Sequence, residues 1–94
     1  MTHHSLKTYR QLERLTKGFA NHRRIQIMEL LKKEPELSVD EIATQLKVNF
    51  KTCAVHVQRL AIAGLVLKRS DGNSVRHKLT SSAESILKFL RTLE

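Results

Sequence analysis

The sequence is poor in the residues that staple or anchor a chain. Its 94 residues include one cysteine, one proline, three glycines, no tryptophan and only four other aromatic residues, one tyrosine and three phenylalanines. A single cysteine excludes an internal disulfide. No apolar run approaches the roughly 20 residues that a membrane-spanning helix needs, and residues 1–10 lack the apolar core of a signal peptide. We therefore expect a cytoplasmic protein with no membrane partner.

Groupings of residues that carry out catalysis are also missing. The sequence shows no pair of carboxylates, no Ser-His-Asp grouping and no glycine-rich phosphate loop. His22, His56 and His77 are scattered without a ligand spacing such as His-x-x-x-His, and His3 and His4 are not interpreted as ligands. We predict that the protein is not an enzyme and has no catalytic, cofactor or metal site.

Acidic residues are scarce, and the basic ones are unevenly distributed. Nine Asp and Glu face 17 Lys and Arg, a net charge of +8. Residues 47–78 contain Asp71 as their one acidic residue and seven basic residues, Lys47, Lys51, Arg59, Lys68, Arg69, Arg76 and Lys78. Such clustering indicates an acidic partner, with nucleic acid favoured over an anionic membrane. The alternative is a solvated face that only keeps the protein soluble.

The residues from Ser38 to Gly64 form the organising motif. Ser38 and Glu41 have the spacing of a capping box at a helix start, and Asn49 is a favourable second N-cap. Apolar positions then recur on one helical face at Cys53, Val57, Leu60 and Gly64, and Gly64 can end the helix. Two short helices joined by a tight turn are typical of a helix-turn-helix.

Three further helices and a hairpin complete the pattern. A first helix is predicted at about 5–18 with an apolar stripe and Gly18 near its end, a second at His22–Lys33 capped by Asn21, and a last at about 82–93 opened by a Ser81–Glu84 capping box. Glu36 and Leu37 are expected to be extended. The period changes to two after Gly64, which predicts strands at 65–69 and 74–79 around a turn containing Asp71-Gly72.

The predicted fold is α+β and mostly α, a winged helix-turn-helix in the order α-α-α-α-β-β-α, as a single domain over residues 1–94. The stripes of the first and last helices could belong to the core. We favour a partly intermolecular role for them, in a homodimer, because a chain this small rarely needs five helices for one core.

Residues 19–79 resemble the ArsR-type winged-helix repressors. The resemblance is carried by FANHRRIQIMELLKK, by ELSVDEIATQLKVNFKTCAVHVQRLAIAGLV and by KRSDGNSVRHKL. It implies a homodimer, paired through its first and last helices, that binds operator DNA. Metal-sensing members have a cysteine pair where this sequence has Leu37-Ser38-Val39-Asp40, and others use histidines on the last helix, where residues 81–94 have none. The resemblance therefore implies a regulator without these metal sites.

Recognition of DNA is expected from the helix at 49–63 and from a basic wing at 65–79. On the helix face opposite Cys53 lie Lys51, Ala54, Val55, Gln58 and Ile62. Gln58 could read adenine, Lys51 could contact a guanine edge or a phosphate, and Ala54 and Val55 could contact only thymine methyl groups. The predicted DNA-binding residues are Asn49, Lys51, Thr52, Ala54, Val55, Gln58, Arg59, Lys68, Arg69, Arg76 and Lys78.

Three alternatives remain open. The weakly polar face formed by Ala54, Val55 and Ile62 would also suit a winged helix that binds another protein within a larger assembly. Cys53 could be a redox switch, although its place on the apolar face favours a buried and inert thiol. His56 could sense pH, although a packing or capping role is favoured.

Overall fold

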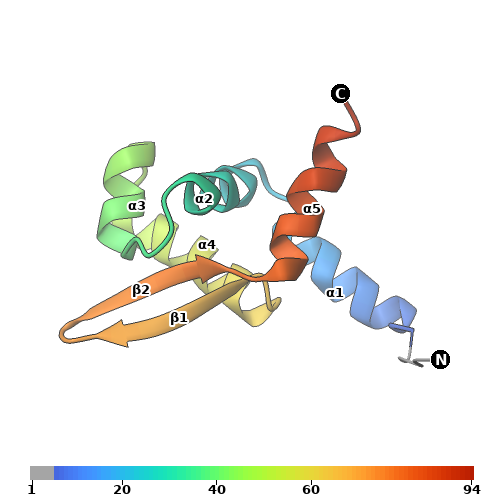
Figure 1. The fold of residues 1–94 in the computed structure, drawn as a ribbon, viewed down its shortest axis with the longest axis horizontal. Helices are drawn as coiled ribbons and strands as arrows, with labels where there is room; N and C mark the ends of the chain where they lie inside the picture. Colours follow the sequence, from blue (N-terminus) through green and yellow to red (C-terminus); the bar gives the residue numbers. More distant parts are fainter. Residues whose placement is uncertain (1–5) are drawn as a thin grey trace.

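The computed structural model describes residues 6–94, which form five helices and one two-stranded antiparallel sheet (Figure 1). The helices are α1 (Tyr9–Phe19), α2 (His22–Lys33), α3 (Val39–Leu46), α4 (Phe50–Ile62) and α5 (Ser81–Arg91), and the strands are β1 (Val66–Asp71) and β2 (Ser74–Leu79). The predicted α+β class and element order are confirmed. His3 and His4 lie outside the described residues.

The core lies where α2, α3, α4, α5 and the base of the hairpin meet. Each helix buries its apolar face there, as the three- and four-residue spacing predicts. Cys53, Val57 and Leu60 form the inner face of α4 and are almost fully buried. The core also contains side chains from the other elements, Ile27, Met28, Leu31, Leu37, Ile42, Ala43, Leu65, Val66, Leu79, Ala83 and Leu87.

The helix-turn-helix forms as its caps predict. Ser38 and Glu41 make both hydrogen bonds of the capping box at α3. Asn49 Oδ1 accepts from the backbone N–H groups of Lys51 and Thr52 at 2.8 and 3.2 Å, which fixes the start of α4. Gly64 follows α4 with φ of +77°, a left-handed conformation that favours glycine.

The first helix begins later than predicted. Leu6, Lys7 and Thr8 are not helical, and α1 begins at Tyr9 because Thr8 and Gln11 form a capping box. The predicted start near residue 5 is therefore wrong, and Leu6 lies outside the helix. Gly18 does not stop the helix either. It is buried inside the last turn of α1, against Ala63.

The last helix is capped by Thr80 rather than by the predicted Ser81. Thr80 Oγ1 accepts from the Ala83 N–H at 3.3 Å and donates to the Gly64 carbonyl at 2.8 Å. The Thr80 hydroxyl thus pairs with a free backbone N–H at the start of α5 and also links this helix to Gly64, beyond the end of α4. The predicted Ser81–Glu84 box is wrong because the helix begins one residue earlier, at Ser81.

The hairpin is longer than predicted and has a tighter turn. Strand β1 extends to Asp71, which pairs with Ser74, so the loop contains only Gly72 and Asn73. Gly72 has φ of +63°, as such a two-residue turn requires. The predicted extended segment is confirmed at Leu37, which forms a β-bridge to His77 at the base of the hairpin. The prediction is wrong at Glu36, whose φ of +71° lies in the left-handed region.

Helices α1 and α5 leave apolar side chains in solvent. They extend from the end of the molecule opposite the hairpin tip (Figure 1). Tyr9 is 90% exposed, Leu93, just beyond α5, is 66% exposed, and Leu12 and Phe89 are also exposed. The inner parts of both stripes contact the core through Leu15, Phe19 and Ile86. Each predicted stripe is therefore only partly used within the chain. Every helix within residues 6–94 is too short or too polar to cross a lipid bilayer.

Candidate nucleic-acid interface

The outer face of α4 is solvent-exposed and carries the side chains that its helical spacing predicts. Lys51, Gln58 and Arg59 are exposed, Val55 is 52% exposed and Ile62 is 70% exposed. The same face carries Thr52, which is exposed, and Ala54, which is half-buried. Because the inner face of the helix is fully packed, α4 presents this outer face on a rigid support.

The first turn of α4 adds a backbone contribution to this face. Asn49 uses its side chain on two of the free N–H groups, and α4 has no acidic residue in its first turn. The positive end of the helix dipole is therefore accompanied by Lys51 and by no negative side chain from the helix itself, which favours an anion such as a phosphate.

The wing contains two kinds of basic residue. Lys68 and Lys78 are exposed, and within residues 6–94 neither has a carboxylate within 4.0 Å. The two arginines are instead held by neighbouring carboxylates.

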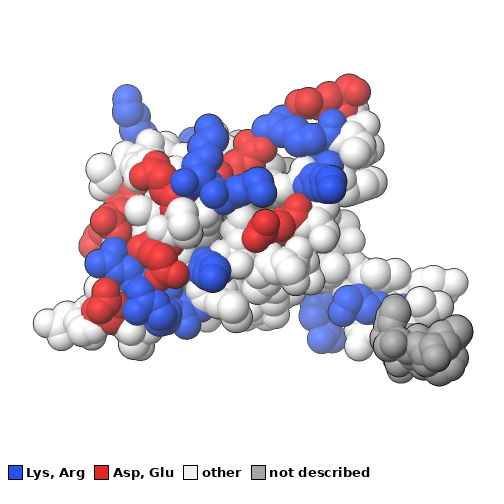
Figure 2. All heavy atoms as spheres, viewed as in Figure 1, with Lys and Arg blue, Asp and Glu red and all other residues white. Residues whose placement is uncertain are grey.

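Arg69 and Arg76 sit opposite each other in the strand register. Arg69 donates to Glu36 Oε1 from Nε at 3.0 Å and from Nη2 at 2.7 Å, and these hydrogen bonds raise the pKa of Arg69. Arg76 donates to Asp71 Oδ2 at 3.2 Å and to Glu41 Oε1 at 3.4 Å. Acidic and basic side chains accordingly alternate over α3 and the hairpin in Figure 2. The two wing arginines therefore form ion pairs within the protein and are not free surface charges.

His77 is a residue whose role sequence reasoning missed. It is 1% exposed, and its Nδ1 lies 2.8 Å from the Leu37 carbonyl oxygen. This contact joins the wing base to the segment before α3, so His77 has a structural role. The only sequence signal was its position among inward-facing strand residues, alternating with Arg76 and Lys78.

Cys53 and His56 both agree with the packing roles that were favoured for them. Cys53 is fully buried, and burial raises the pKa of its thiol. His56 is half-buried, and its Nδ1 accepts from Arg24 Nε at 3.2 Å. Burial lowers the pKa of His56, and the neighbouring Arg24 and Arg59 lower it further.

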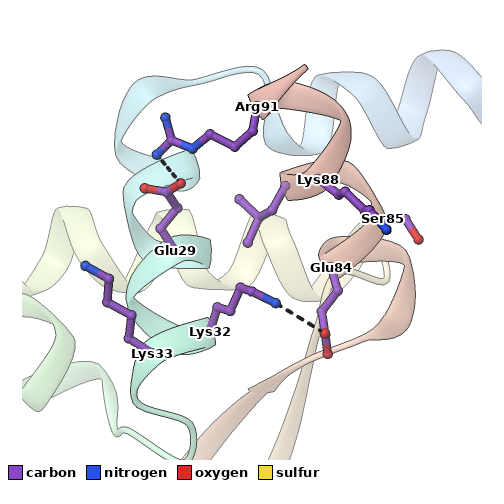
Figure 3. A pocket seen from close by; sticks show the side chains of 8 residues that line it. Glu29, Lys32, Lys33, Glu84, Ser85, Lys88 and Arg91 are labelled. Carbon is purple, nitrogen blue, oxygen red and sulfur yellow. Dashed lines mark hydrogen bonds and ion pairs between the residues drawn. The ribbon is translucent and has the colours of Figure 1, made fainter. Parts of the chain in front are cut away.

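A groove with a cavity of about 890 Å³ lies between α2 and α5, away from the α4 face. Figure 3 shows that acidic and basic side chains from the two helices meet across it. Glu29 pairs with Arg91, and Lys32 lies 3.6 Å from Glu84. These two ion pairs fasten α5 to α2. Within residues 6–94, no three His, Cys, Asp or Glu side chains are arranged to hold a metal ion.

Comparison with known proteins identifies the same architecture. A family model described as winged helix-turn-helix DNA-binding matches residues 21–66. The HTH-type transcriptional regulator Rv0324 of Mycobacterium tuberculosis is 36% identical over 69 residues, which make up 73% of this chain and 30% of that protein. The chain therefore spans about 30% of the length of this curated relative.

Two solved structures extend the likeness over most of the chain. One is the homodimeric winged helix-turn-helix DNA-binding domain of Mb0332 from Mycobacterium bovis, a possible ArsR-family transcriptional regulator. It is 27% identical with a TM-score of 0.80, over 96% of this chain and 89% of that chain. The other is the transcriptional regulator HlyU from Vibrio vulnificus CMCP6, which is 30% identical with a TM-score of 0.73, over 89% of this chain and 88% of that chain.

Proposed function

We propose, on the premise that this chain belongs to the ArsR-type winged helix-turn-helix DNA-binding family, that it binds double-stranded DNA as a homodimer and represses transcription. The observation that carries this proposal is the outer face of α4, which is exposed, rigidly supported and basic at its N-terminal end. An α-helix fits into the major groove of B-DNA, which is about 12 Å wide.

Base reading would rest on few side chains. Gln58 can form a bidentate pair with adenine, and Lys51 can reach a guanine edge or a phosphate. The methyl groups of Val55 and Ala54 can contact the methyl group of thymine. Asn49 and Thr52 lie at the first turn of α4, which would approach the phosphate backbone of the DNA. Because Gln58 and Lys51 are the two side chains that we assign to base edges, we expect a short recognised sequence in each half-site.

The wing would contact the sugar-phosphate backbone beside the groove. Lys68 and Lys78 can do so without giving up an ion pair. Arg69 and Arg76 would have to exchange Glu36 and Asp71 for phosphate, so their net contribution to affinity is expected to be smaller. The wing arginines would then serve mainly to hold the hairpin at a fixed angle to α3.

A homodimer would use the exposed apolar side chains of α1 and α5. Tyr9 and Leu12 on α1, and Phe89 with Leu93 at the end of α5, have no partner that covers them within residues 6–94. Burying such side chains against a second copy is favourable by about 25 cal/mol per Å². The Mb0332 domain is itself homodimeric.

Selection of bound duplexes from a random pool would test the DNA-binding proposal. A two-fold symmetric dimer should select a palindrome whose half-sites lie about one helical turn, 10–10.5 base pairs, or a multiple of it apart. Recovery of random sequences with no shared motif, or of a single unpaired half-site, would contradict the proposal of a sequence-specific dimer.

Sedimentation equilibrium would test the dimer itself. The change Phe89→Asp should shift the protein to a monomer, because it places a charge in the proposed interface. The control is Val75→Asp, which makes the same kind of change at an exposed apolar residue of the wing. Equal effects of the two substitutions would argue against an interface on α5.

The second candidate function is a protein-interaction module. It is supported by three exposed apolar residues on or beside the outer face of α4, Phe50, Val55 and Ile62. A protein partner would bury this cluster, and Lys51→Glu would leave its binding intact. Gel filtration with and without duplex DNA separates the two candidates, because only the first predicts a complex with DNA.

A further inference from the structure

A small cavity of about 200 Å³ lies where α1, α2 and α4 meet. We call it the junction cleft. Four basic side chains line it, Arg14 and Lys17 from α1, Arg24 from α2 and Arg59 from α4. Ile62 lines the same cleft and belongs to the outer face of α4, so the cleft opens beside the proposed DNA-binding face.

The backbone holds Arg24 at the centre of this cleft. Its Nη1 donates to the carbonyl oxygens of Lys17 and Gly18 at 2.9 and 3.1 Å, and its Nε donates to His56. Arg24 thus satisfies carbonyl groups at the C-terminal end of α1. Its guanidinium is fixed by these contacts rather than by a carboxylate.

The charge of the cleft is not balanced by the residues around it. Lys17 pairs with Glu13 at 3.3 Å, but Arg14, Arg24 and Arg59 have no carboxylate within 4.0 Å among residues 6–94. Burial and the charge of Arg59 lower the pKa of Arg24. Burial lowers the pKa of His56, and the basic neighbours Arg24, Arg59, His22 and Arg23 lower it further.

Two other groups of basic residues within residues 6–94 differ in this respect. The wing arginines pair with Glu36, Glu41 and Asp71. The groove between α2 and α5 is closed by the pairs Glu29–Arg91 and Lys32–Glu84 (Figure 3). The basic side chains of the junction cleft repel one another, and among residues 6–94 no carboxylate within 4.0 Å of its three arginines offsets this repulsion. Such an arrangement indicates that a binding partner supplies the negative charge.

We infer that the junction cleft binds a phosphate group of the DNA backbone. This inference rests on the proposed function and adds to the contacts of the recognition helix and the wing a contact through Arg14 and Lys17 of α1 and Arg24 of α2. Arginine guanidinium groups suit the site because their planar donors match phosphate oxygens in pairs. The cleft volume of about 200 Å³ is smaller than the roughly 300–1,000 Å³ of small-molecule pockets, so the cleft suits a single phosphate group.

The length of α4 fits this second contact. Lys51 and Arg59 are eight residues apart, which corresponds to about 12 Å along the helix axis. This separation is close to the width of the major groove, about 12 Å. With Lys51 near one margin of the groove, Arg59 and the junction cleft would reach phosphates near the other.

The salt dependence of DNA affinity provides the decisive experiment. The variant is Arg14→Gln, because Arg14 is exposed and lies in the cleft, and the matched control is Arg10→Gln, one turn earlier on the same helix and outside the cleft. Binding to the selected palindromic duplex is measured by fluorescence anisotropy at several salt concentrations, and circular dichroism melts confirm that both variants fold.

A lost phosphate contact reduces the slope of log Kobs against log salt by about 0.9, or by about 2 for the two subunits of a dimer. We expect Arg14→Gln to show this reduction with unchanged sequence preference, and Arg10→Gln to keep the wild-type slope. Equal slopes for the two variants would overturn the inference and leave a solvated face. A wild-type slope near zero would instead overturn the proposed function.

The ring resonances of His56 report on the occupant of the cleft. The charged groups that act on this histidine are His22, Arg23 and Arg24 from α2 and Arg59 from α4. Of these, Arg24 and Arg59 line the cleft together with Arg14 and Lys17. A bound DNA phosphate would offset their repulsion, so the pKa of His56 should rise when the duplex binds. A rise with tripolyphosphate but none with duplex would show a site for a free anion and would overturn the inference.

Discussion

Replacing Gly18 with alanine should force α1 away from α4. A Cβ atom at Gly18 would lie 2.3 Å from the Cβ of Ala63, while carbon atoms in ordinary contact are about 3.5–4.0 Å apart. The last turn of α1 and the end of α4 would therefore have to separate by about 1–2 Å. Both contact atoms belong to short, rigid side chains or backbone, so neither can move aside without moving its helix.

The magnitude follows from two opposing effects. Overpacking of this kind costs about 1–3 kcal/mol, while replacing a helical glycine with alanine returns up to about 1 kcal/mol. In the wild-type background the net effect should be a loss of about 1 kcal/mol in the free energy of unfolding. In an Ala63→Gly background the clash disappears, and the same substitution should become stabilising.

Urea denaturation of the four proteins of this double-mutant cycle, followed by circular dichroism at one protein concentration, measures the coupling. We expect Gly18→Ala to change sign between the two backgrounds. Effects that agree within about 0.5 kcal/mol in both backgrounds would mean that the residues do not couple. That result would contradict the close packing of Gly18 in α1 against Ala63 at the end of α4.

Three further predictions concern caps, buried groups and pH. Ser38→Ala should lower the free energy of unfolding by about 1 kcal/mol in urea titrations, because it removes the cap of α3, and an unchanged midpoint would contradict this. Hydrogen bonds from Ser38 hold the pKa of Glu41 below its usual range. The stability that they contribute should be present at neutral pH and lost as the pH falls through that lowered pKa, and Glu41→Gln should remove this part of the acid dependence. Cys53 should react with a thiol reagent at pH 8 only at the rate of unfolding, and rapid labelling of the folded protein would revive a redox role.

Local signals explain which parts of this fold could be predicted from the sequence. Asn21, Ser38 and Asn49 cap helices within their own first turns, so their roles can be read from a few neighbouring residues. The change from a period of about 3.6 to two after Gly64 likewise marked the hairpin. The caps of the outer helices were missed because Thr8 precedes a helix whose apolar stripe suggested an earlier start, and Thr80 competes with an equally suitable Ser81.

Contacts between distant residues could not be predicted in this way. Glu36 lies 33 residues from Arg69, and nothing in either segment indicates that the wing arginine is held by it. Gly18 looked like a helix stop because its packing partner, Ala63, lies in a different helix. The junction cleft combines side chains from three helices, so the clustering of charge along residues 47–78 identified only Arg59 among its basic residues.

DNA binding by the outer face of α4 is the central claim, and the charge reversal Lys51→Glu tests it most directly. The control is Lys33→Glu, the same change in the groove between α2 and α5. The measurement is the affinity for the selected duplex by fluorescence anisotropy over a range of salt. For the wild-type protein, we expect the logarithm of the binding constant to fall linearly with the logarithm of the salt concentration. Lys51→Glu should weaken binding by at least about tenfold more than the control does. Affinity that does not respond to salt, or equal losses in the two variants, would contradict the account.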